Sequence, residues 1–184
     1  PMEITYLRIR NFKSIQDMEI SDIDQALILV GKNNTGKTSV LDAISAVCGS
    51  YEISPHDFNE RRQAVRIQVR LRIQEEDLRL LHRLGRVSRY RRFEAWQKAF
   101  CQKLPSFQDG TLSFTFHANQ DGKLRYEDGF RKHNPVIPQI LPRLYRIGAE
   151  RELGQLQNDL LMFQENEQLQ KIRSGRCMFE QAKE

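Results

Sequence analysis

Residues 26–48, ALILVGKNNTGKTSVLDAISAVC, constrain the fold of this chain more than any other stretch. The unbroken apolar run at residues 26–30 predicts a buried strand. The residues that follow, GKNNTGKT, fit G-x-x-x-x-G-K-S/T at every fixed position. Apolar residues then recur at helical spacing as far as Cys48, and Gly49 stands where a C-terminal cap is expected. Strand, glycine-rich loop and helix, in this order, form the context of a phosphate-binding loop.

The residue types in this loop are those that hold a polyphosphate. Gly31 and Gly36 let backbone amides approach closely, because a side chain there would hold the phosphates off. Lys37 brings a positive charge to the outer phosphates, and Thr38 offers a hydroxyl to Mg²⁺. The alternative, a glycine-rich turn that binds nothing, is disfavoured by the full match of motif and context. The candidate nucleotide-binding residues are Gly31, Lys32, Asn33, Asn34, Thr35, Gly36, Lys37, Thr38 and Ser39, with Thr38 also the candidate metal ligand.

Composition excludes several classes of protein. The chain has 184 residues, of which 39% are hydrophobic and 29% charged, as in soluble globular proteins. No apolar run is long enough to cross a bilayer, and PMEITYLRIRNF at the N-terminus has no signal-peptide core. The three cysteines lie far apart without a C-x-x-C pair, which argues against a disulfide framework or a zinc site. From this cysteine usage we expect a protein of the reducing cytoplasm. The net charge of +5 permits nucleic acid as a partner but equally fits a mildly basic, solvated surface.

Periodicity predicts the remaining elements. The clearest signal is strict alternation over residues 65–73, which predicts a strand with one buried and one basic face. In strand 3–10, alternation places Leu7 and Ile9 on one face and Ile4 with Tyr6 on the other. Further predicted strands are 17–20, antiparallel to the first, 111–118 and 124–126 as a hairpin, and 144–147; predicted helices are 75–85, 88–104 and a segment from 150 onward, while 134–142 is expected to be irregular. Because nothing caps the last helix before Glu184, we expect a fragment of a longer chain.

Basic residues gather around the two helices predicted between residues 75 and 104. They are Arg79, Arg83, Arg86, Arg89, Arg91, Arg92 and Lys98, and they alternate with aromatic residues. One interpretation is a nucleic-acid surface, since such surfaces combine basic and aromatic side chains. The other is that the aromatic residues pack inward and the arginines are solvated. The helical spacing of Tyr90, Phe93, Trp96, Phe100 and Leu104 favours the second interpretation.

The parts needed for efficient ATP hydrolysis are not recognisable in the sequence. An apolar strand that ends in an aspartate should hold Mg²⁺ and polarise the attacking water. The nearest segment is LRIQEED at residues 71–77, but it alternates with charge and its acids fall in an expected turn. There is no L-S-G-G-Q-like signature and no N-K-x-D motif of a guanine-specific GTPase. The catalytic residues are therefore unknown, although nucleotide binding is predicted.

Two segments carry a resemblance to a known family. ITYLRIRNFKSIQDMEI followed by GKNNTGKTSVLDAIS resembles the N-terminus of ABC-type ATPases of the RecF and SMC class. Within that class, the Asn33–Asn34 pair and the segment NFKS at residues 11–14 look most like the OLD family (overcoming lysogenization defect) of ATP-dependent endonucleases. LPRLYRIGAERE, at residues 141–152, is similar to the segment that closes the first ATPase lobe. The resemblance is strong over the first fifty residues and looser from residue 65 to 152.

This resemblance implies an α/β fold, namely the first lobe of a P-loop NTPase of ABC-ATPase type with an antiparallel β side sheet and a helical insertion. The implied parts are a P-loop core at residues 1–60, the side sheet at 61–152 with its basic insertion at 75–104, and a helical segment at 153–184. ATP and Mg²⁺ are the implied ligands, with Lys13 near the nucleotide. The implied partners are DNA and a second copy of the ATPase. No membrane partner is implied. A RecF- or SMC-like protein that clamps DNA and has no nuclease is the alternative.

Overall fold

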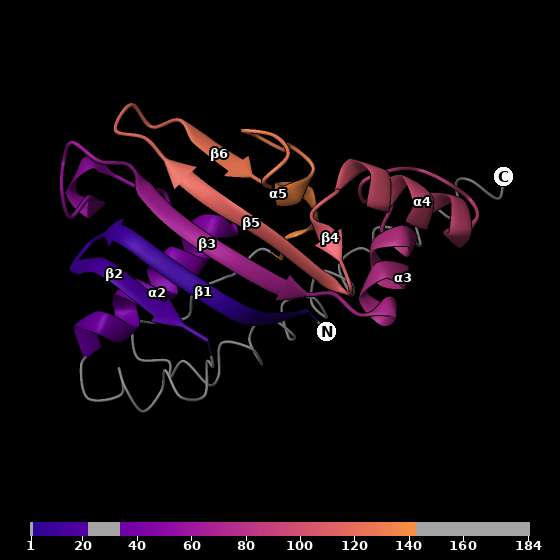
Figure 1. Cartoon of the computed structure of the whole chain (residues 1–184), viewed down its shortest axis with the longest axis horizontal. Helices are drawn as coiled ribbons and strands as arrows, with labels where there is room; N and C mark the ends of the chain where they lie inside the picture. The colour runs from indigo at the N-terminus through magenta and orange to yellow at the C-terminus, as the bar shows by residue number, and fades with distance from the viewer. Residues whose placement is uncertain (1, 22–33, 143–184) are drawn as a thin grey trace, which may run out of the picture.

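A 6-stranded antiparallel sheet organises the computed structural model, which describes residues 2–21 and 34–142 (Figure 1). The strand order is β2-β1-β3-β5-β4, and β6 also pairs with β5. The strands are β1 (Glu3–Phe12), β2 (Ile15–Ile20), β3 (Val65–Arg72), β4 (Phe107–Gln108), β5 (Thr111–Ala118) and β6 (Leu124–Glu127). The prediction of an antiparallel β1–β2 pair, the alternating strand from residue 65 and the hairpin that follows is confirmed. The sheet combines β1 and β2, from the expected P-loop part at residues 1–60, with β3 to β6, from the expected side-sheet part.

A β-bulge corrects the prediction for the start of β1. Tyr6 pairs with Arg70 and Ile4 with Leu71, so that Thr5 is an extra residue in the ladder. The bulge turns Ile4 to the same face as Leu7, and Ile4 is buried at 7% exposure. The prediction that Ile4 lies opposite Leu7 was therefore wrong, because simple alternation assumes an unbroken ladder.

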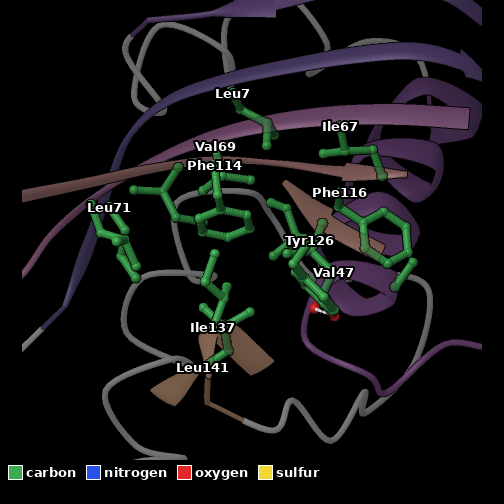
Figure 2. Packing of buried hydrophobic residues seen from close by; sticks show 14 of the residues in the cluster. Leu7, Val47, Ile67, Val69, Leu71, Phe114, Phe116, Tyr126, Ile137 and Leu141 are labelled. Carbon is green, nitrogen blue, oxygen red and sulfur yellow. Dashed lines mark hydrogen bonds between the residues drawn. The ribbon is translucent and has the colours of Figure 1, made fainter. Parts of the chain in front are cut away.

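The core lies between the inner face of the sheet and helix α2 (Asn34–Val47), with the short helix α5 (Ile137–Ile140) beside it. Figure 2 shows side chains of β1, β3, β5 and β6 meeting those of α2 and α5. The alternating apolar residues of β3 and β5 point into this layer, as their pattern predicted; they are Val65, Ile67, Val69, Leu71, Leu112, Phe114, Phe116 and Ala118. The Tyr126 hydroxyl donates a hydrogen bond to the Val47 carbonyl oxygen and so ties β6 to the end of α2 (Figure 2).

Helices α3 (Glu75–Arg83) and α4 (Phe93–Lys103) pack together at one end of the sheet. The second predicted helix began at residue 88, but α4 begins at Phe93. Residues 88–92 are not helical, and they contact side chains of both helices: the Tyr90 carbonyl oxygen lies 2.7 Å from His82 Nε2 of α3, and the Lys103 ammonium of α4 donates to Ser88 Oγ at 2.7 Å. Trp96 and Phe100 are fully buried, whereas Tyr90 is 50% exposed and does not belong to the predicted apolar stripe. The inward packing of the α4 aromatics favours the interpretation that the surrounding arginines are solvated.

Helix α5 is a further difference from the prediction. The segment 134–142 was predicted to be irregular but contains this helix, because Ile137 and Ile140 bury their side chains against the sheet. The predicted strands at residues 26–30 and 144–147 and the predicted helix from residue 150 lie outside the described residues. Within the described ranges, no helix has the length and apolarity of a membrane span.

Phe116→Ala should lower the free energy of unfolding by about 3–5 kcal/mol, because it leaves a cavity at a fully buried position of the core. Leu124→Ala is the matched control, since Leu124 lies on the same hairpin but is 51% exposed, and it should change stability by no more than about 0.5 kcal/mol. Urea unfolding followed by circular dichroism measures both. Equal effects of the two changes would contradict the position of the core.

Candidate nucleotide-binding site and its contacts with the sheet

Helix α2 contains the last residues of the phosphate-loop motif. The helix predicted after the loop is thus confirmed, and Gly36, Lys37 and Thr38 lie within its first two turns. Gly36 is buried and Thr38 is half-buried. The candidate residues 31–33, and the side chains of Asn34, Thr35 and Lys37, lie outside what the structure describes. Free backbone amides and the helix dipole favour an anion at this end of a helix. The nucleotide contacts of the individual residues stay predictions.

Helix α2 carries a line of buried polar residues after the phosphate-loop motif. Ser39, Asp42 and Ser45 are spaced three residues apart and therefore share one side of the helix. Each is no more than 5% exposed, although the helix packs in an otherwise apolar layer. A buried carboxylate is costly unless a cation or hydrogen-bond donors compensate its charge. Asp42 therefore points to a structural partner elsewhere in the chain.

That partner is Lys13, in the turn between β1 and β2. The Lys13 ammonium forms an ion pair with the Asp42 carboxylate, and the two side chains are 26% and 2% exposed. The same ammonium lies 4.9 Å from the centre of the Tyr51 ring. The Tyr51 hydroxyl donates to Asp57 Oδ1 at 2.9 Å, and burial is the main cause that raises the pKa of Tyr51. The cluster joins α2, the β1–β2 turn and the segment after α2.

The backbone at the end of β1 and in the turn to β2 has an unusual conformation. Asn11 and Lys13 have φ angles of 61° and 53°, in the left-handed region that asparagine tolerates better than lysine. The Asn11 side-chain amide donates to the carbonyl oxygens of Glu60 and Gln63 at 3.0 and 2.9 Å. The Lys13 backbone N–H donates to the Asp57 carbonyl oxygen at 2.6 Å. These contacts hold the segment in the position from which the Lys13 side chain reaches Asp42 of α2.

Lys13 was predicted to lie near the nucleotide. Asp42 follows Thr38 by four residues, about one helical turn. The Lys13 ammonium therefore lies alongside the early turns of the helix that carries the motif, with its charge directed at Asp42. A direct contact between Lys13 and a nucleotide stays a prediction. Sequence reasoning missed Asp42, although one acid within the run SVLDAISAV was a usable signal.

The acids at residues 75–77 have a structural role. They occupy the first turn of α3, where negative charge is favourable, and not the turn that the sequence predicted. The Gln74 backbone N–H donates to Asp77 Oδ2 at 2.8 Å, which caps the helix. In the part of the chain that the structure describes, no cluster of three or more His, Cys, Asp or Glu side chains could hold a metal ion. The catalytic residues therefore remain unassigned.

Comparison with known proteins gives one family. The sequence model of the AAA ATPase domain family matches residues 2–172. The match covers both the phosphate-loop motif and every described strand. No curated protein matches the chain, and no solved structure matches it either.

Lys13→Met should lower the free energy of unfolding by about 3–5 kcal/mol, because the buried Asp42 carboxylate then loses its cation. The control Arg72→Met removes an exposed partner of Glu3 at 3.6 Å and should cost less than about 1 kcal/mol. Chemical denaturation at neutral pH compares the two variants. If Lys13→Met were as mild as the control, the ion pair could not be what holds the turn on α2.

Proposed function

Because the chain belongs to the AAA ATPase domain family, we propose that it is the ATP-binding N-terminal part of an OLD-like, ABC-type ATPase and endonuclease that acts on DNA in repair or phage defence. The family supports ATP binding, and the motif GKNNTGKT at the start of α2 supplies the residues for it. The resemblance of the first fifty residues to OLD proteins supports the narrower assignment.

The observation that carries this proposal is the attachment of α2 to the sheet through Lys13 and Asp42. The last residues of the phosphate-loop motif form the first turns of α2, so a change there on nucleotide binding would act on the helix and on the β1–β2 turn together. An ATPase that drives work on DNA needs such a connection between its nucleotide and a second surface.

The donor set fits Mg²⁺–ATP. Gly36 is buried in the first turn of the helix, where a backbone can come close to a phosphate, and Thr38 carries the hydroxyl that a P-loop offers to Mg²⁺. Lys37 would neutralise the outer phosphates. Bound Mg²⁺ would supply charge neutralisation on the phosphate oxygens. We propose that the acid that polarises water comes from a further segment, and that two ATPase units join around ATP.

A RecF- or SMC-like protein that clamps DNA without cutting it is the second candidate. The NFKS turn and the phosphate-loop motif, which carry the resemblance, are shared across that whole class. Incubation of the complete gene product with plasmid DNA, Mg²⁺ and ATP separates the two candidates. Cleavage supports the OLD-like protein, whereas ATP-dependent retention of uncut DNA supports the clamp.

A calorimetric titration of residues 1–184 with Mg²⁺–ATP, with phosphate release measured on the same sample, tests the proposal. We expect binding without turnover, because the phosphate loop is present and no acid for hydrolysis is recognisable. Turnover would show that a catalytic acid lies within these residues. A lack of binding would contradict the assignment of the loop for this chain on its own.

Lys37→Ala should abolish measurable ATP binding, because it removes the cation that neutralises the outer phosphates. Lys98→Ala, on the exposed side of α4, removes the same charge far from the motif in the sequence and should leave affinity unchanged. Calorimetry measures affinity, and circular dichroism confirms that both variants fold. Retained affinity in Lys37→Ala would contradict the phosphate-binding role.

A further inference from the structure

The face of the sheet opposite α2 carries a row of basic side chains. Arg10 of β1 is paired with Arg66 of β3, Arg66 with His117 of β5, and His117 with Arg125 of β6. These four residues alternate with the core residues of their strands, so they share the outer face. Neighbouring strands lie about 4.8 Å apart, so the row extends over about 14 Å. In Figure 1, α2 lies behind the sheet and no described helix crosses in front of β1, β3 and β5.

The row is electrostatically unfavourable without an anion. Like charges directly opposite each other destabilise a pair of strands. Arg10 Nε is buried and has no hydrogen-bond partner among the described residues. Burial, followed by the charges of Arg66 and Arg8, lowers the pKa of Arg10. Burial, followed by the charge of Arg125, likewise lowers the pKa of His117, against the opposing effect of Glu127.

The acids on this face are engaged by Arg8 and by His117, so neither pairs directly with Arg10 or Arg66. Asp17, opposite Arg10, accepts from Arg8 Nε and Nη2 at 3.0 and 2.8 Å. Glu127 Oε1 lies 3.1 Å from His117 Nε2. Within the described residues, 2–21 and 34–142, no ion pair joins Arg10 or Arg66 to a carboxylate. The middle of the row therefore has positive charge available for an external anion.

We propose that Arg10, Arg66, His117 and Arg125 form a binding site for the phosphate backbone of a nucleic-acid strand. Guanidinium groups match phosphate geometry and bind it through two parallel hydrogen bonds. A polymer fits better than a single anion, because three arginines and a histidine stand in a line across four strands. Gln68 and Thr115, paired with each other beside the row, offer further hydrogen bonds to sugar and phosphate. The large exposed hydrophobic residues of the described part, Tyr90, Leu124 and Phe130, are absent from these outer positions, unlike in a membrane-binding surface.

This site rests on the proposed action on DNA but not on ATP binding or hydrolysis. Its residues lie on the opposite side of the sheet from α2, so that the two surfaces can be tested separately. Loss of ATP binding in Lys37→Ala should leave binding of nucleic acid without nucleotide intact. Conversely, if the row variants bound nucleic acid normally, the proposed nucleotide site would not be affected by that result.

Fluorescence anisotropy of a labelled oligonucleotide across a range of salt concentrations tests the site. Arg10→Gln with Arg66→Gln should weaken binding about tenfold or more and make the salt slope shallower by about 1.4 to 1.8. The matched control, Arg89→Gln with Arg91→Gln, removes the same charge from the exposed segment between α3 and α4 and should weaken binding less than about twofold. The single change Arg66→Gln, at an exposed side chain, keeps the test valid if the double variant fails to fold. Equal losses in the row and control variants would overturn the proposal.

The pKa of His117 gives a local readout. His117 faces Arg66 on β3 and Arg125 and Glu127 on β6, so a phosphate between the arginines should raise its pKa. NMR titration of the histidine ring protons, assigned with His117→Gln, should show this rise with the oligonucleotide and not with Mg²⁺–ATP. An unchanged pKa with bound oligonucleotide, or an equal rise and equal affinity with inorganic phosphate, would overturn the polymer site.

Discussion

The packing of α2 on the inner face of the sheet is the interaction on which the rest of the structure depends. Val40, Ile44 and Val47 share one side of the helix and bury their side chains beneath β1, β3 and β5. An isolated helix of this length is marginal in water, so the sheet stabilises the helix that carries the phosphate loop. The sheet in turn needs α2, because its alternating strands leave a whole apolar face to cover. The nucleotide site and the sheet are thus one structural unit.

A polar contact within this apolar layer joins the helix to the sheet. The Lys13–Asp42 ion pair connects residues 29 positions apart in the chain, and the Asp42 side chain is only 2% exposed. Its turn is held from behind by the hydrogen bonds of Asn11 to residues 60–64. The strained left-handed backbone at Lys13 persists because these contacts over-determine it. The NFKS segment at residues 11–14 therefore joins the helix to the sheet.

The two faces of the sheet differ in chemical character: the inner face is apolar and the outer face is basic. The inner face buries the helix whose start carries the motif of an ATP-binding family. The outer face sets arginines from separate strands opposite one another. Strand pairing alone creates that outer row, because no segment of the sequence contains its four residues together. The fold thus places the helix that begins in the phosphate-loop motif and the row of outer arginines on opposite faces of a single layer of backbone.

The sequence by itself determined the features that depend on local pattern. The motif GKNNTGKT, the helix after it and the alternating strands at residues 65–73 and 111–118 follow from neighbours within a few positions, and residue types reveal them directly. The model of the AAA ATPase domain family matches residues 2–172, which include these stretches. The bulge at Thr5, the start of α4 at Phe93, the partner of Asp42 and the row from Arg10 to Arg125 were decided by tertiary structure. Each of these depends on the register or contact of segments distant in the chain, and periodicity, which is local, carries no information about register.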